Sequence, residues 1–185
     1  MSELFSIQLQ NRQQQGGDGV WLDLPTTTEQ VQVALRQIGI SSDNPQGLFI
    51  SGYFAEEEKR FAISYNMVLA SNVDELNFLA SRLETLSTGE RAELNAALQA
   101  PQSELFSIGR ITDFPENVDY YVHLPDVHGP AQLGDYYLNR SGMVNMPEEW
   151  KGGIDTAQFG RYVAQQEQGA FTQYGYLVKS GDEWQ

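Results

Sequence analysis

Two histidines and an aspartate in one short stretch are the residues whose spacing comes nearest to a chemical site. His123, Asp126 and His128 lie in the sequence HLPDVHGP, beside Pro125 and Pro130. Imidazole nitrogens and carboxylate oxygens bind metals, but a stable site needs further ligands at defined spacing, and the chain has no Cys to supply them. We therefore expect a surface loop here, with no metal and no cofactor.

Motifs for nucleophilic catalysis and phosphate binding are also missing from the sequence. It contains no Gly-x-Ser-x-Gly segment and no Gly-Lys-Ser/Thr loop, and its glycine-rich residues 16–19 include Asp18 in place of a lysine. Carboxylates are abundant, and two of them could serve as general acid and base, but nothing marks out one pair. We expect no catalytic residues and no enzyme; a hydrolase without a known motif is the weakest alternative.

Net charge is the most informative bulk property. The chain has 25 acidic and 11 basic residues, for a formal net charge of −14. Such a protein repels nucleic acids and anionic membranes and prefers basic partners. The acids are scattered, with short runs at residues 56–58 and 148–149, which favours a charged folded surface over a disordered acidic tail. The charge either keeps the protein dispersed or is itself the function, by fitting a groove built for DNA.

Hydrophobic patterning divides the chain into elements of an α+β protein. Residues 4–10 and 20–24 alternate as strands, and a helix begins at Thr26–Thr28 and ends at Gly39. Residues 48–54 predict a third strand. These elements predict an N-terminal α+β domain over residues 1–60.

The middle and last parts of the chain predict two further domains. Apolar residues at helical spacing indicate helices over 73–86 and from Ser87 or Thr88 to Pro101, which make a helical middle domain over 61–102. Residues 103–185 predict a C-terminal α+β domain, with strands at 105–111, 120–124 and 171–178 and a helix at 155–166. We expect an elongated chain of two small antiparallel-sheet-plus-helix units flanking the helical domain.

An internal similarity supports two related α+β units. SELFSI at residues 2–7 recurs at 103–108, VWLDLP at 20–25 resembles YYVHLP at 120–125, and GLFISGYF at 47–54 resembles GAFTQYGYL at 169–177. The three matches occur in the same order. Two copies are too few for a repeat solenoid.

Targeting signals are not evident in the sequence. Residues 1–15 lack the basic and apolar regions of a secretory signal, and no apolar run approaches the length of a membrane span. The absence of Cys fits a reducing compartment. We expect a cytoplasmic protein.

Several segments together resemble the ArdA family of antirestriction proteins over nearly the whole chain. They are GVWLDLP at residues 19–25, the amphipathic helix that ends at Gly39, FISGYF at 49–54, and DTAQFGRYVAQQEQGAFTQYGYLV at 155–178, the most specific of the four. The resemblance implies an acidic three-domain protein of mobile genetic elements that forms elongated homodimers. It also implies that the protein mimics bent B-form DNA and inhibits type I restriction-modification enzymes, without binding nucleic acid or membranes. The alternative is an acidic adaptor or regulator that binds another basic, DNA-binding protein.

A DNA-mimic surface requires exposed carboxylates in a row on rigid elements. The polar faces of the two middle helices and the acidic run before them meet this requirement best, and acids near residues 18–29 extend the row. The expected mimic surface comprises Asp18, Asp23, Glu29, Glu56, Glu57, Glu58, Asp74, Glu75, Glu84, Glu90 and Glu93.

The weakly charged, Tyr-rich stretch 132–146 is the expected homodimer interface, since Tyr is enriched at subunit interfaces. The alternative is that these side chains fill the core of the third domain. The expected interface residues are Tyr136, Tyr137, Leu138, Met143, Val144 and Met146.

Overall fold

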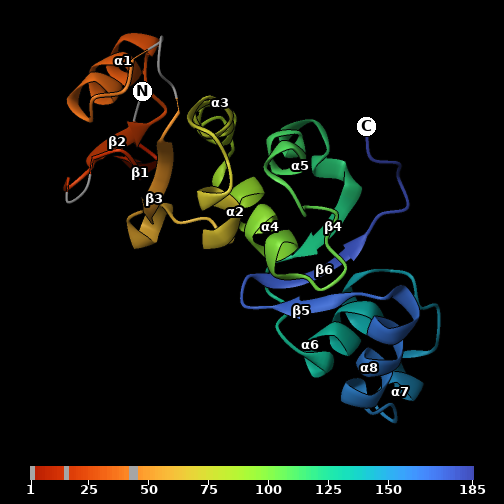
Figure 1. The fold of residues 1–185 in the computed structure, drawn as a ribbon. Helices are drawn as coiled ribbons and strands as arrows, with labels where there is room; N and C mark the ends of the chain where they lie inside the picture. Colours follow the sequence, from red (N-terminus) through yellow and green to blue (C-terminus); the bar gives the residue numbers. More distant parts are fainter. Residues whose placement is uncertain (1–2, 15–16, 42–45) are drawn as a thin grey trace. The chain divides into compact units, whose positions relative to one another are not determined.

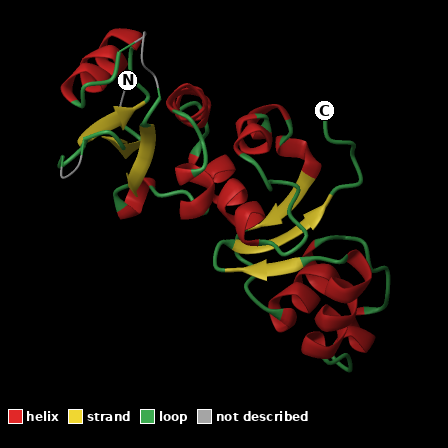
Figure 2. Cartoon of the chain, in the orientation of Figure 1, coloured by secondary structure: helices red, strands yellow, loops and turns green. Residues whose placement is uncertain are grey.

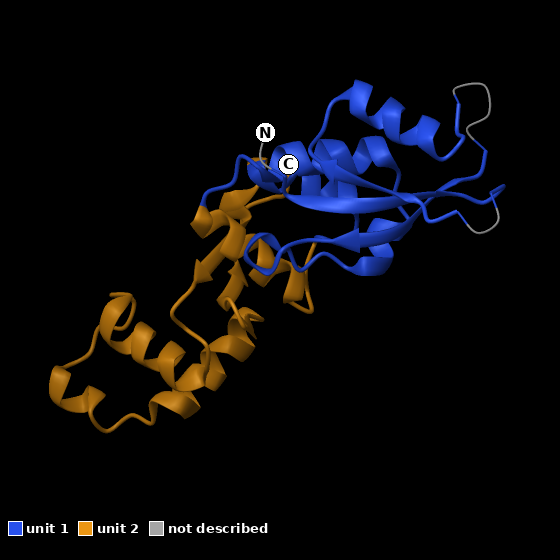
Figure 3. Ribbon diagram, turned by 90° about the vertical axis from the view of Figure 1, so that its left-hand side faces the viewer, with its two compact units in different colours: residues 1–87, 105–115 blue, residues 88–104, 116–185 orange. Residues whose placement is uncertain are grey.

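The computed structural model describes residues 3–14, 17–41 and 46–185, which form two compact units. Unit 1 comprises residues 1–87 and 105–115, and unit 2 comprises residues 88–104 and 116–185 (Figure 3). Residues 1, 2, 15 and 16 lie outside the described residues. They belong to the first fifteen residues, the SELFSI segment and the glycine-rich stretch 16–19. The two units divide the expected helical stretch 61–102 between them, and the three-domain division stays a prediction.

Unit 1 is built on a three-stranded antiparallel sheet in the order β2-β1-β3 (Figure 1). Its strands, as predicted from the period-two alternation, are β1 (Phe5–Asn11), β2 (Val20–Leu24) and β3 (Leu48–Phe54). Phe5, Ile7 and Leu9 on one face of β1 are almost fully buried. In the register, Leu24 and Leu22 of β2 lie opposite Phe5 and Ile7, so one face of the sheet forms the core.

Helix α1 (Thr28–Gln37) follows β2 and packs on it. Thr27 caps the helix: its hydroxyl accepts a hydrogen bond from the Gln30 amide at 3.3 Å, and the Gln30 carboxamide accepts one from the Thr27 amide. This reciprocal capping box satisfies two amide donors that the first turn leaves unpaired. At the other end, the Asn11 side chain donates to the Ile38 carbonyl at 3.0 Å and ties the helix end to β1.

The remaining elements of unit 1 are short helices. They are the 3-10 helix η1 (Glu57–Lys59), α2 (Tyr65–Leu69), α3 (Val73–Leu83) and α5 (Ile108–Thr112), with η2 (Phe114–Glu116) at the boundary of the units. Helix α3 packs against α5. The predicted strand over 105–111 is wrong: Ser107 caps α5 through its hydroxyl, and Leu105, Ile108 and Ile111 recur every three residues and are buried. Ile108 and Ile111 lie on one face of α5, and Leu105 lies before the helix. A short apolar run of this kind does not distinguish a helix from a strand.

Unit 2 also contains a three-stranded antiparallel sheet, in the order β4-β6-β5. The strands are β4 (Tyr121–Leu124), β5 (Ala170–Thr172) and β6 (Gly175–Lys179), preceded by α4 (Thr88–Gln99) and the 3-10 helix η3 (Val118–Tyr120). The single strand predicted over 171–178 is instead the hairpin β5–β6. Gly175, with φ of +120°, makes the turn possible, since few L side chains adopt that backbone conformation.

Four helical segments lie on the side of the unit 2 sheet opposite α4 (Figures 1 and 2). They are α6 (Pro130–Asp135), the π-helical turn η4 (Tyr136–Arg140), α7 (Glu148–Lys151) and α8 (Thr156–Glu167). The core there consists of Val127, Leu133, Ala164 and Tyr176. Helices α6 and α8 cross with their backbones in close contact, because both have glycine at the crossing.

Both units combine helices with an antiparallel sheet, which confirms the α+β class. The internal similarity is weaker in structure than in sequence. Residues 20–25 and 120–125 contribute strands in both units, but 103–108 form no strand, and the central strand is β1 in unit 1 and β6 in unit 2. In the described part of the chain, no helix combines the length and the apolar character needed to cross a membrane.

Candidate functional site

The two histidines have different surroundings. His123 lies in β4, and its Nε2 is 2.7 Å from the Tyr174 carbonyl oxygen in the β5–β6 turn, an arrangement in which the ring nitrogen donates. His128 is exposed, and its backbone amide donates to the Gln132 side chain at 2.7 Å. Among residues 3–14, 17–41 and 46–185, no three His, Asp or Glu side chains are placed to hold a metal ion together.

The acids expected at the N-terminal end of the mimic surface are exposed. Asp18 precedes β2, Asp23 lies within it, and Glu29 is in the first turn of α1. The pKa of Glu29 is lowered, chiefly by a hydrogen bond from the backbone amide and also by one from the Thr27 hydroxyl. It therefore stays ionised at neutral pH. Its charge also complements the positive end of the helix dipole.

The acidic run before α2 forms a turn of 3-10 helix with all three carboxylates exposed. Glu56 pairs with Lys59 at 3.0 Å, a solvent-exposed ion pair of small energetic value. On α3, Asp74 is exposed and Glu75 is half-buried, and Glu84 at the C-cap of this helix is also half-buried. Unit 1 therefore holds nine of the eleven expected residues, most of them at its surface.

Glu93 departs from the expectation that these acids face the solvent. Its side chain on α4 is half-buried, and its Oε1 is inaccessible and has no hydrogen-bond partner among the described residues. Burial raises the pKa of Glu93 to about 7, with smaller contributions from the negative charges of Glu90 and Asp119. At neutral pH, Glu93 carries only part of a charge and is a poorer phosphate mimic than an exposed carboxylate.

Unit 2 also has an acidic region that the sequence did not predict. Glu116, Asp119, Asp182 and Glu183 are exposed and line a hollow of about 500 Å³. The segment after β6 is held at this hollow, because the Gln185 amide donates to the Asn117 side chain at 2.8 Å. The Trp184 ring also packs edge-on against Tyr120. The adjacent acids at 182–183 are visible in the sequence, but their proximity to 116–119 depends on the fold.

The residues expected at a dimer interface divide into buried and exposed groups. Leu138 is buried, and Tyr136 and Tyr137 pack against the core of unit 2. Met143 is 76% exposed, and Val144 and Met146 are half-buried.

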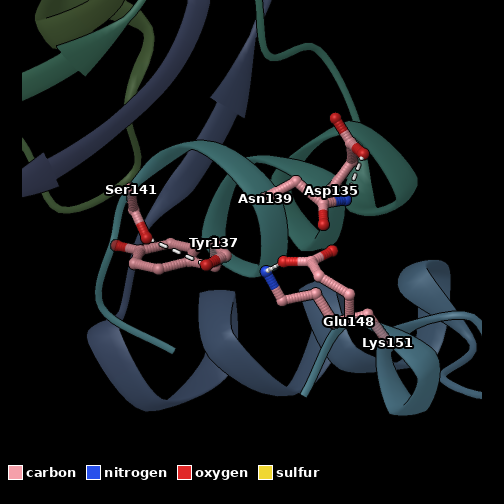
Figure 4. A network of polar contacts seen from close by, with 6 residues as sticks. All are labelled: Asp135, Tyr137, Asn139, Ser141, Glu148 and Lys151. Atoms are coloured by element: carbon pink, nitrogen blue, oxygen red, sulfur yellow. Dashed lines mark hydrogen bonds and ion pairs between the residues drawn. The ribbon is translucent and has the colours of Figure 1, made fainter. Parts of the chain in front are cut away.

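Polar contacts fix the segment that leads to Met143, Val144 and Met146. The Tyr137 hydroxyl donates to Glu167 at 2.5 Å, and Tyr176 donates to the other oxygen of the same carboxylate at 3.1 Å. Burial, and then the hydrogen bond to the Glu167 carboxylate and its negative charge, raise the pKa of Tyr137. Ser141 donates to the Tyr137 carbonyl at 2.9 Å and closes the π-helical turn, and Lys151 pairs with Glu148 at 2.7 Å (Figure 4).

Fold and surface together define an acidic α+β protein whose carboxylates are spread over the exposed faces of both units. Comparison with known families matches residues 16–178 to the antirestriction protein (ArdA) family. The chain belongs to this family, which consists of inhibitors rather than catalysts. A comparison with curated proteins finds no match.

Proposed function

We propose that this chain inhibits type I restriction-modification enzymes by occupying their DNA-binding groove as a mimic of B-form DNA. Membership of an antirestriction family, in a chain of net charge −14 with exposed carboxylates on both units, is the observation that carries the proposal. Restriction enzymes act inside the cell, so the protein acts in the cytoplasm. It needs no cofactor, because occupying a groove involves no chemical step.

The physical basis is the charge density that a DNA groove is built to receive. Duplex DNA carries one negative charge per roughly 1.7 Å of its axis, and proteins bind it largely through Lys and Arg contacts with phosphates. Exposed carboxylates on short helices and strand ends, such as Asp18, Glu29 and Glu57, can meet the same basic residues. Glu116, Asp119, Asp182 and Glu183 extend this surface in unit 2.

A homodimer would present two such surfaces. The interface rests on the exposed Met143 and its neighbours Val144 and Met146, since Tyr137 and Leu138 are occupied within the core of unit 2. An isologous interface would relate the two acidic surfaces by a two-fold axis, in the manner of a bipartite recognition site.

Competition for a type I enzyme against its own DNA tests the proposed function. We expect the protein to displace DNA from the methyltransferase core, and its affinity to fall steeply between low and high salt because charge pairing dominates such grooves. Binding that leaves DNA in place would instead indicate an acidic adaptor. Affinity independent of salt would exclude electrostatic mimicry.

A further inference from the structure

The face of the unit 1 sheet opposite its core carries an unusual combination of side chains. The strand alternation and register place Ser6 and Gln8 of β1, Trp21 and Asp23 of β2, and Gly52 and Phe54 of β3 on this face. Trp21 is 50% exposed and Phe54 is 53% exposed. A tryptophan and a phenylalanine exposed on one sheet face form an interaction surface rather than a core.

Trp21 reaches across this sheet face and remains half-exposed. In the register, Trp21 is opposite Gln8, and its Cη2 atom reaches Gly52 on the far strand, 3.0 Å from where a Cβ would stand. A side chain at residue 52 would crowd both the indole and the Gln8 side chain and force them to shift. The glycine therefore lets the indole reach β3, where it forms a half-exposed aromatic platform.

Two carboxylates stand beside this platform. The Ser6 hydroxyl is 2.9 Å from Asp23 Oδ1 and 3.2 Å from Glu3 Oε1, so a single donor holds both acids close together. Glu3, Trp21 and Asp23 line a pocket of about 370 Å³ whose other walls are Leu22, Pro25, Thr26 and Gln30. Of the described residues that line this pocket, none is Lys or Arg, so the two negative charges face it without a cation.

Thr26 holds the end of the pocket in place. Its amide donates to the Asn77 side chain at 2.7 Å, and the Asn77 amide group donates back to the Thr26 carbonyl at 3.0 Å. These paired bonds fasten the chain after β2 to α3. The pocket wall is therefore formed before any partner binds, which lowers the ordering cost of binding.

We propose that this pocket binds an arginine side chain of the protein partner, with the guanidinium group stacked on Trp21 and hydrogen-bonded to Asp23 and Glu3. A guanidinium group is planar, stacks on aromatic faces and offers several N–H donors in a fixed fork, whereas an ammonium group is a compact, strongly hydrated charge. Charge complementarity selects a cation and excludes a nucleobase on a phosphate backbone. Only the identity of the partner, a type I enzyme, rests on the proposed function.

A direct titration tests the pocket without the enzyme. The probe is N-acetyl-arginine amide added to the full chain, with the Trp21 indole N–H followed by NMR and assigned by its loss in Trp21→Phe. We expect a saturable shift, an affinity weaker by about tenfold for the lysine analogue, and no shift with the uncharged citrulline analogue. Equal shifts with arginine and citrulline, or no shift with arginine, would overturn the proposal.

Variants then test the pocket in the complex. Trp21→Leu and Asp23→Asn should each weaken binding to the enzyme core about tenfold. Asp74→Asn, an exposed acid of unit 1 outside the pocket, should weaken it only about two- to fivefold, the effect of one exposed charge. If Asp23→Asn and Asp74→Asn weaken binding equally and Trp21→Leu leaves it unchanged, binding depends on charge alone. That result would refute the pocket but not the proposed mimicry of DNA. If the parent protein does not bind the enzyme, the proposed function fails. The titration with N-acetyl-arginine amide still tests whether the pocket binds an arginine side chain.

Discussion

Glu93 has the most strongly perturbed carboxyl group among the expected mimic residues, and its environment predicts a pH effect on stability. Its pKa of about 7 in the folded chain exceeds the ordinary value of 4.5. Between these two pH values the folded state binds more protons than the unfolded state, so the free energy of unfolding falls as pH rises from about 4.5 to about 7. Above about pH 7, ionisation of Glu93 causes no further change in the free energy of unfolding.

Glu93→Gln should remove this pH dependence, because an amide cannot ionise. We expect the variant to be more stable than the parent at pH 8 by on the order of 1–2 kcal/mol, a figure discounted for partial solvent exposure, and nearly equal to it at pH 5. Urea unfolding at both pH values measures the difference. Glu149→Gln, at an exposed position of α7, is the matched control and should show neither effect.

At the level of elements, the crossing of α6 and α8 depends on two glycines. A Cβ on Gly160 would lie 1.8 Å from the Pro130 carbonyl oxygen, and one on Gly134 would lie 1.9 Å from that of Thr156. These neighbours are backbone atoms, which cannot turn aside as a side chain can. The two helices pack this closely only because both positions lack a side chain.

Gly160→Ala should therefore destabilise unit 2 despite the higher helix propensity of alanine. The overpacking cost of about 3 kcal/mol or more exceeds the gain of about 1 kcal/mol from propensity. Gly152→Ala is the matched control, since a Cβ there meets open space and its φ of −63° suits alanine. Equal unfolding midpoints for the two variants would contradict the close backbone contact.

At the level of the whole molecule, mimicry predicts many weak contacts that share the binding energy. A single Glu→Gln change at an exposed acid should have little effect on inhibition. The combined variant Glu56→Gln, Glu57→Gln, Glu58→Gln and Asp74→Asn should lose about 2–4 kcal/mol of binding, if each acid contributes about 0.5–1 kcal/mol. The fold should survive, because these side chains are exposed.

Circular dichroism measures whether the combined variant folds, and a restriction assay measures how well it inhibits. A folded variant that inhibits as well as the parent would show that these four residues are not part of the binding surface. Neutralising Glu116, Asp119, Asp182 and Glu183 in the same way tests the acidic region of unit 2 independently of unit 1.

The homodimer is a second property of the whole molecule. Sedimentation at tens of micromolar, well above the dissociation constants of specific interfaces, should show a dimer, and Met143→Glu should shift it to monomer by burying a charge in an apolar contact. Met143 is exposed in the single chain, so the folded protomer should tolerate the change. Sedimentation of the parent protein as a monomer would contradict the proposed interface.

Sequence alone predicted the elements whose pattern is local. The strands at 20–24 and 48–54 and the helices that begin near Thr28, Thr88 and Asp155 match the structure closely, because alternation, helical spacing and capping residues act over a few neighbouring positions. Net charge and the α+β class follow from composition and from the order of these elements. The segments that carry the resemblance to the family were likewise visible without a structure.

Tertiary structure decided what depends on residues far apart in the chain. In the short apolar run at 105–111, residues from Ile108 onward form α5, which packs on α3. Residues 171–178 lie in the hairpin of β5 and β6, and β6 also pairs with β4. VWLDL places Trp21 and Asp23 on one strand face, but only the neighbouring strands bring Ser6 and Gly52 beside them. Glu93 looked like any surface glutamate, yet its pKa depends on burial, on Glu90 in its own helix and on Asp119 in another element. Burial and charge pairing are sums over neighbours in space, and sequence patterns report only the neighbours along the chain.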